Sequence, residues 1–136
     1  MNVLVDTDVW SEALRKRKGK KSDYVLELVD LIQEGRLEMI GPIRMEILSG
    51  IRKAETFDAF SDKLATFPDR PMDSSVYIMA ARFYNLCRSK GIQGSNTDFQ
   101  ICACAVQWSV PILSKDKDYE LYKKHIPIDL IKPRKR

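Results

Sequence analysis

Hydrophobic residues along the chain follow two alternating patterns. Short, mainly apolar runs of the kind found in strands buried on both faces occupy residues 3–5, 37–40, 110–114 and 126–131. Between these runs, apolar residues recur at the three- and four-residue spacing of amphipathic helices. This spacing predicts helices over residues 9–14, 23–34, 42–51, 53–67, 75–90, 99–108 and 119–124.

Strands separated by helical crossovers predict a mainly parallel sheet. We therefore expect an α/β fold, a three-layer α/β/α sandwich, and a single domain over residues 1–136. The helix at 99–108 is almost wholly apolar and rich in small residues, so it should be packed on most sides and lie centrally. Pro127 near the start of the last strand suits an edge of the sheet.

Composition places the chain among ordinary globular proteins, with 44% hydrophobic and 31% charged residues. No apolar run approaches the length of a membrane span, and the N-terminus leads directly into a strand, so we expect a cytoplasmic protein with no membrane partner. The three cysteines, Cys87, Cys102 and Cys104, lie in apolar helical patterns and are expected to be buried, reduced thiols.

Charge adds a weaker indication of a polyanionic partner. The net charge is +4, and basic runs stand at residues 15–21 and 132–136. Either run could equally be a solvated loop or tail.

Four acids fall at comparable places in the predicted fold. Asp6 ends the first strand, Glu46 lies in the helix after the second, Asp98 opens the apolar helix, and Asp116 follows the third strand. Ligands of open α/β sheets bind beyond the carboxyl ends of the strands, and three of these acids, at strand ends or helix starts, should lie at that same edge. Gathered carboxylates repel one another unless a hard cation lies among them, which favours Mg²⁺ or Mn²⁺. With His125 as the single histidine, a zinc site is disfavoured.

Each acid, taken alone, also has a purely structural interpretation. Asp6 or Asp8 could cap the helix that follows, and for Asp8 we favour that role. Asp98 could interact with its helix dipole, and Glu46 and Asp116 could be ordinary surface charges. The functional hypothesis therefore rests on the four acids as a set.

The motifs around these acids resemble those of PIN domains. The similarity covers the strand and acids at residues 3–8, Glu46 followed four residues later by Gly50, Asp98 opening an alanine-rich helix, and the final strand motif at residues 112–119. In order and spacing, and over essentially the whole chain, they resemble VapC-type toxins of type II toxin–antitoxin systems. Two positions depart from the usual pattern: Asp8 stands where Asn or Ser is commoner, and Tyr119 replaces a usual Phe.

The resemblance implies a Mg²⁺- or Mn²⁺-dependent endoribonuclease that cleaves RNA phosphodiesters with metal-activated water. It implies a cognate antitoxin protein and a homodimer as partners. Asp6 and Asp98 would ligate the metal directly, while Glu46 and Asp116 would hold its waters. We choose Asp116 as the fourth acid and expect Asp118 to orient the turn.

Other residues take supporting roles in this hypothesis. Ser114 or Thr7 would orient a ligand or contact phosphate. The basic runs at 15–21 and 132–136 would contact the RNA backbone.

Two alternatives remain open from the sequence. Residues 3–9 also fit the first motif of haloacid-dehalogenase-like phosphatases, with Asp6 as nucleophile and Asp8 as general acid. That hypothesis leaves Glu46 and Asp98 unexplained. The other alternative is a non-catalytic PIN-like module that binds RNA or a protein partner.

Overall fold

The computed structural model describes residues 1–15 and 19–136. Its elements follow the order predicted from the hydrophobic pattern as far as the third strand and the helix after it. They are β1 (Val3–Val5), α1 (Thr7–Leu14), α2 (Asp23–Gln33), β2 (Leu37–Glu38), α3 (Gly41–Leu48), α4 (Ala54–Leu64), α5 (Ser74–Ser89), α6 (Asn96–Trp108), β3 (Ile112–Leu113) and α7 (Asp118–Lys123).

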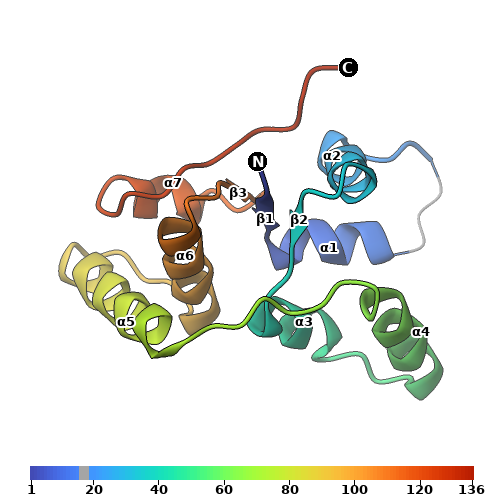
Figure 1. Cartoon of the computed structure of the whole chain (residues 1–136), viewed down its shortest axis with the longest axis horizontal. Helices are drawn as coiled ribbons and strands as arrows, with labels where there is room; N and C mark the ends of the chain where they lie inside the picture. Colours follow the sequence, from blue (N-terminus) through green and yellow to red (C-terminus); the bar gives the residue numbers. More distant parts are fainter. Residues whose placement is uncertain (16–18) are drawn as a thin grey trace.

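The three strands form a parallel sheet with the order β2-β1-β3. Leu4 of β1 pairs with Glu38 on one side and with Ile112 on the other. All three residues of β1 are fully buried, as expected for a central strand covered on both faces. The predicted α/β/α arrangement is confirmed, since α1 and α2 lie on one side of the sheet and α5 and α6 on the other (Figure 1).

The predicted fourth strand, residues 126–131, is wrong as a strand. The segment makes only an isolated parallel bridge between Leu130 and Ile112. It does lie at the edge beside β3, because the Ile112 amide donates to the Asp129 carbonyl and the Ile131 amide donates to the Ile112 carbonyl. Pro127 has no amide hydrogen to donate, which keeps its end of the segment out of the ladder.

Helix α6 is the central helix that the sequence predicts. Phe99 and the five residues Ile101 to Ala105 are buried, and the helix packs against α5, α3 and β3. Because α6 precedes a parallel strand, it runs antiparallel to β3. Its first residues therefore lie at the carboxyl edge of the sheet, next to the ends of β1 and β3.

The three cysteines are buried and free, as predicted. In the described part of the chain, no helix is both long and apolar enough to cross a membrane.

Candidate active site

Asp6 is fixed at the carboxyl end of β1 by contacts on both sides. Its amide donates to the Leu113 carbonyl of β3 at 2.9 Å. One carboxylate oxygen, Oδ1, accepts a hydrogen bond from the Thr7 amide at 2.8 Å, and the other, Oδ2, accepts one from the Ser114 hydroxyl at 2.8 Å. Only 5% of Asp6 is exposed. Asp6 is therefore the N-cap of α1 and a buried, oriented carboxylate at the same time.

Asp8 does not cap α1, so the role favoured for it from the sequence is wrong. It lies inside the first turn, where its Oδ2 accepts from the Lys115 amide at 3.0 Å and more weakly from the Ser114 hydroxyl at 3.4 Å. Its Oδ1 is buried and has no hydrogen-bond partner among the described residues. The Ser114 hydroxyl thus joins Asp6 and Asp8. Whether it orients a metal ligand stays a prediction.

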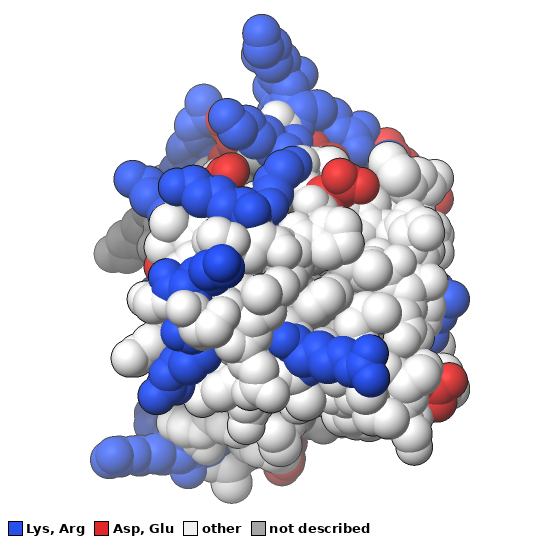
Figure 2. All heavy atoms as spheres, turned by 90° about the vertical axis from the view of Figure 1, so that its left-hand side faces the viewer, with Lys and Arg blue, Asp and Glu red and all other residues white. Residues whose placement is uncertain are grey.

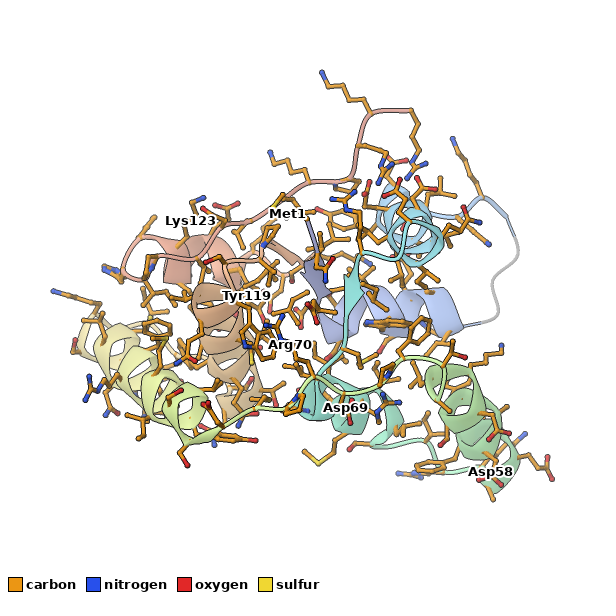
Figure 3. All side chains as sticks on the ribbon, viewed as in Figure 1. Met1, Asp58, Asp69, Arg70, Tyr119 and Lys123 are labelled. Carbon is orange, nitrogen blue, oxygen red and sulfur yellow. The ribbon has the colours of Figure 1, made fainter. Side chains whose placement is uncertain are left out.

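Asp98 lies in the first turn of α6, whose N-cap is Ser95. Its carboxylate accepts a hydrogen bond from the Tyr122 hydroxyl at 2.7 Å and a longer one from the Tyr119 hydroxyl at 3.5 Å. Both tyrosines belong to α7 and are buried. Figure 3 shows Tyr119 between α7 and α6, inside the fold.

Asp116 follows β3 in the turn that leads to α7. Its amide donates to the Ser114 hydroxyl at 3.0 Å, and its Oδ1 accepts from the Asp118 amide at 2.9 Å. The carboxylate that orients this turn therefore belongs to Asp116, and the expectation that Asp118 would do so is wrong.

Electrostatic coupling shows that these acids share one region. Burial raises the pKa of Asp6 to about 7, helped by the negative charges of Asp8 and Asp98. Burial, with the charge of Asp116, also raises the pKa of Asp8. The charge of Asp116, followed by burial and the charge of Asp98, raises the pKa of Asp118. The acids from β1, α1, α6 and the β3–α7 turn thus repel one another near the carboxyl edge.

Glu46 is the predicted acid for which the structure shows no link to the others. It is exposed on α3. Among the described residues no hydrogen bond or ion pair involves its side chain. Its role stays a prediction.

The chemical type of these donors, carboxylate oxygens, suits a hard divalent cation. The oxygens of Asp6, Asp98 and Asp116 are the ligands that Mg²⁺ and Mn²⁺ prefer. A cation would offset the burial and the repulsion that together raise the pKa of Asp6. The unpartnered Oδ1 of Asp8 is a further buried acceptor. Within the described residues, however, no three His, Cys, Asp or Glu side chains already converge closely enough to hold an ion. Hydrogen bonds to Ser114 and Tyr122 hold Asp6 and Asp98 individually in this arrangement.

The sequence did not reveal the ion pair between Lys115 and Glu12. The Lys115 ammonium lies 3.0 Å from Glu12, which is 4% exposed on α1 and also accepts from Ser22. Lys115 therefore bonds Asp8 through its amide and Glu12 through its side chain, which fixes the β3–α7 turn against α1. Spacing offered one signal, because Asp8 and Glu12 stand four residues apart on one helix face.

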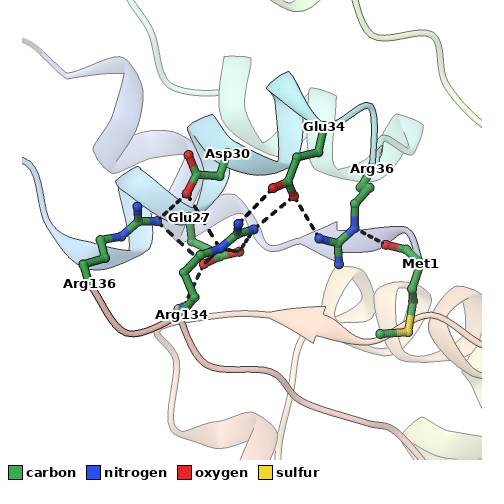
Figure 4. Close-up of polar contacts among 7 residues, drawn as sticks. All are labelled: Met1, Glu27, Asp30, Glu34, Arg36, Arg134 and Arg136. Carbon is green, nitrogen blue, oxygen red and sulfur yellow. Dashed lines mark hydrogen bonds and ion pairs between the residues drawn. The ribbon is translucent and has the colours of Figure 1, made fainter.

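The arginines of the C-terminal basic run are paired with acids of α2 (Figure 4). Arg134 lies 2.8 Å from both Glu27 and Glu34, and Arg136 lies 2.8 Å from Asp30. These arginines are therefore engaged within the fold. In the other predicted basic run, residues 16–18 lie outside the described residues.

Together, the fold and the acids define the class of the protein: a PIN-like α/β domain with an acidic carboxyl edge. Solved structures share this fold at low identity. The VapBC2 complex from Rickettsia felis, bound to a DNA fragment from its promoter, superposes with a TM-score of 0.76 at 14% identity, over 96% of this chain and 98% of that chain. FitAcB from Neisseria gonorrhoeae superposes with a TM-score of 0.74 at 20% identity, over 96% and 97%.

Curated relatives carry the identification further. Ribonuclease VapC11 from Mycobacterium tuberculosis is 29% identical over 123 residues, covering 88% of this chain and 90% of that protein. Ribonuclease VapC6 from the same species is 33% identical over 90 residues, covering 63% and 70%. Models of known protein families do not match the chain. The chain belongs to the VapC ribonuclease family, as its motifs indicated.

Proposed function

We propose that this chain is a divalent-metal-dependent endoribonuclease and the toxin of a toxin–antitoxin pair. It would act in the cytoplasm, with residues 1–136 as one catalytic domain. The observation that carries the proposal is the coupling of Asp6, Asp8, Asp98 and Asp116 at the carboxyl edge, where the pKa of Asp6 is raised to about 7. Membership of a ribonuclease family supports the same activity.

Asp6 and Asp98 would hold the cation, Mg²⁺ or Mn²⁺, with Glu46 and Asp116 holding its waters. When bound, a divalent cation lowers the pKa of water and offsets charge on the pentavalent phosphorus transition state. The protein contributes orientation: Ser114 and the Thr7 amide hold Asp6, and Tyr122 holds Asp98. Because the pKa of Asp6 is about 7, cation binding must displace a proton from it below neutral pH.

The RNA backbone would approach over lysines that surround a hollow beside the acids. Ser114 and Asp116 line this hollow together with Lys117, Lys123 and Lys132. Lys123 points outward from α7 (Figure 3). Basic side chains are also spread over the face that carries α5 and α7, where few acidic ones are seen (Figure 2). Such contacts would position RNA without reading its sequence.

A cognate antitoxin would act by covering the acids. An apolar hollow formed by Leu14, Ile47, Ile51 and Phe60 opens beside Asp8, so a protein segment seated there would block access to the carboxyl edge. The solved VapBC complexes share this fold.

A homodimer would need a second apolar surface. Helix α5 exposes Ile78 and Leu86, which lie toward the same side of the helix, with exposed fractions of 56% and 40%. Sedimentation of the purified chain, alone and with Ile78→Glu, measures whether this face holds two copies together.

RNA cleavage tests the proposed activity. The purified chain should cut single-stranded RNA in Mg²⁺ and lose that activity in a chelator. Asp6→Asn and Asp98→Asn should each abolish cleavage. Asp58→Asn should not, because Asp58 is exposed on α4, away from β1 and α6 (Figure 3). Full cleavage by Asp6→Asn would sink the proposal.

The phosphatase alternative makes a different demand on Asp6. It requires a phosphorylated Asp6 intermediate, and it leaves Asp98 and its two tyrosines without a role. Trapping of a covalent phosphate on Asp6 would favour it over the ribonuclease.

A further inference from the structure

The short helix α7 presents two tyrosine hydroxyls to one acid of the site. Tyr122 donates to Asp98 Oδ2 at 2.7 Å, a short distance typical of a hydrogen bond to a charged acceptor. Tyr119 donates to Oδ1 of the same carboxylate at 3.5 Å. Each oxygen of the Asp98 carboxylate therefore accepts a hydrogen bond from a tyrosine hydroxyl, which fixes the orientation of the carboxylate.

The Tyr122 ring is held by close packing. It lies 4.9 Å from the Phe99 ring and 5.3 Å from the Tyr119 ring, measured between centroids. Gly94, in the loop before α6, is packed directly against it. A methyl group at Gly94 would lie 2.8 Å from Tyr122 Cζ and 2.9 Å from Phe99 Cε2, and would collide with the Tyr122 hydroxyl. Position 94 thus has room for glycine only, and the ring has no room to turn away.

Burial keeps both tyrosines as donors. Tyr122 is fully buried and Tyr119 is 1% exposed. Each hydroxyl donates to the Asp98 carboxylate rather than to solvent.

We propose that Tyr122 is a positioning residue, assisted by Tyr119, that orients the Asp98 carboxylate toward a divalent cation at the acidic edge. This inference rests on the proposed metal-dependent function. It assigns to α7 a role that apolar packing alone would not need, since a phenylalanine would fill the same ring volume. Partners that orient metal ligands commonly change metal affinity by about 10- to 100-fold when removed.

Calorimetric titration with Mn²⁺ tests the proposal without relying on catalysis. Tyr122→Phe keeps the ring and deletes the donor, and it should bind Mn²⁺ about tenfold more weakly than the wild type. Tyr119→Phe, which deletes the longer bond, should have a smaller effect in the same direction. The Mg²⁺ concentration for half-maximal RNA cleavage should rise in the same order.

Tyr84→Phe is the matched control. Its ring packs edge-on against the same Phe99 at 5.6 Å, but its hydroxyl accepts from Arg88 rather than donating to Asp98. It should bind Mn²⁺ within about twofold of the wild type. Equal Mn²⁺ affinity in Tyr122→Phe, Tyr84→Phe and wild type would overturn the proposal, even if melting temperatures fall.

Failure of the proposed function gives a different result. If the wild type binds no divalent ion, or if Asp6→Asn still cleaves RNA, the metal-dependent nuclease is refuted and the role of Tyr122 falls with it. If the wild type binds Mn²⁺ and Asp6→Asn is inactive, unchanged binding by Tyr122→Phe refutes the positioning role alone.

Discussion

Replacing Asp6 by asparagine should stabilise the metal-free protein relative to wild type, and by more as the pH rises. Asp6 has a pKa of about 7 in the fold against 3.8 in an unstructured chain. Between these values the unfolded chain has released a proton that the folded chain keeps, so ionisation of Asp6 progressively favours unfolding. This contribution is absent below pH 3.8 and complete above about pH 7.

The size of the effect follows from the two pKa values. A difference of about 3 units corresponds to about 4 kcal/mol at pH 8, and to about 1.5–2 kcal/mol at pH 5, where the folded carboxyl is still protonated. An asparagine side chain at this position avoids the cost while keeping an oxygen for the Thr7 amide. We therefore expect the stability advantage of Asp6→Asn over wild type to grow by about 2–3 kcal/mol between pH 5 and pH 8.

Urea unfolding in a chelator, at pH 5 and pH 8, measures this difference. The matched control is Asp58→Asn, whose exposed side chain should leave stability within about 0.5 kcal/mol of wild type at both pH values. An advantage of Asp6→Asn that stays constant with pH would show that the Asp6 carboxyl does not have a raised pKa in the folded protein.

Three further outcomes follow from the structure. Glu46→Gln should lower cleavage by about 10- to 100-fold with little change in melting temperature, since Glu46 is exposed; unchanged kinetics would remove it from the site. Lys123→Ala with Lys132→Ala should weaken RNA binding and reduce the salt slope by about 1 per lost phosphate contact, whereas Lys53→Ala should do neither, as filter binding at several salt concentrations would show. Arg134→Ala should free the C-terminal segment from α2, which would appear as faster amide exchange in that segment and a lower melting temperature. Unaltered exchange would show that Arg134 does not hold the segment against α2.

The first three strands and the central helix were predictable because buried strands and helices have simple, characteristic patterns of apolar residues. Val3, Leu4 and Val5 form a short apolar run that ends at the polar residues Asp6 to Asp8, which is the pattern of a strand covered on both faces. The small residues of α6 allow neighbouring elements to pack closely against it. The last strand was not predictable at this level. Its apolar residues stand beside β3, but a single bridge at Leu130 is all that the backbone forms.

The proximity of Asp6 and Asp98 was predictable from topology, because parallel strands bring their carboxyl ends together, whereas the exposed position of Glu46 was not. The partners of the acids were not predictable either. Tyr119 and Tyr122 stand three residues apart on a short helix and resemble core aromatics, and only the fold shows that their hydroxyls meet Asp98. The roles of Asp8 and Asp118 were misassigned because capping depends on backbone geometry that residue type leaves undetermined.

We propose that Asp6 and Asp98, which are far apart in sequence, hold one divalent cation at the carboxyl edge of the sheet. Anomalous diffraction from crystals grown with Mn²⁺ locates that cation directly. We expect a peak at about 2.1 Å from carboxylate oxygens of both residues. A peak that contacts neither of them, or no peak among these acids at saturating Mn²⁺, would contradict this proposal.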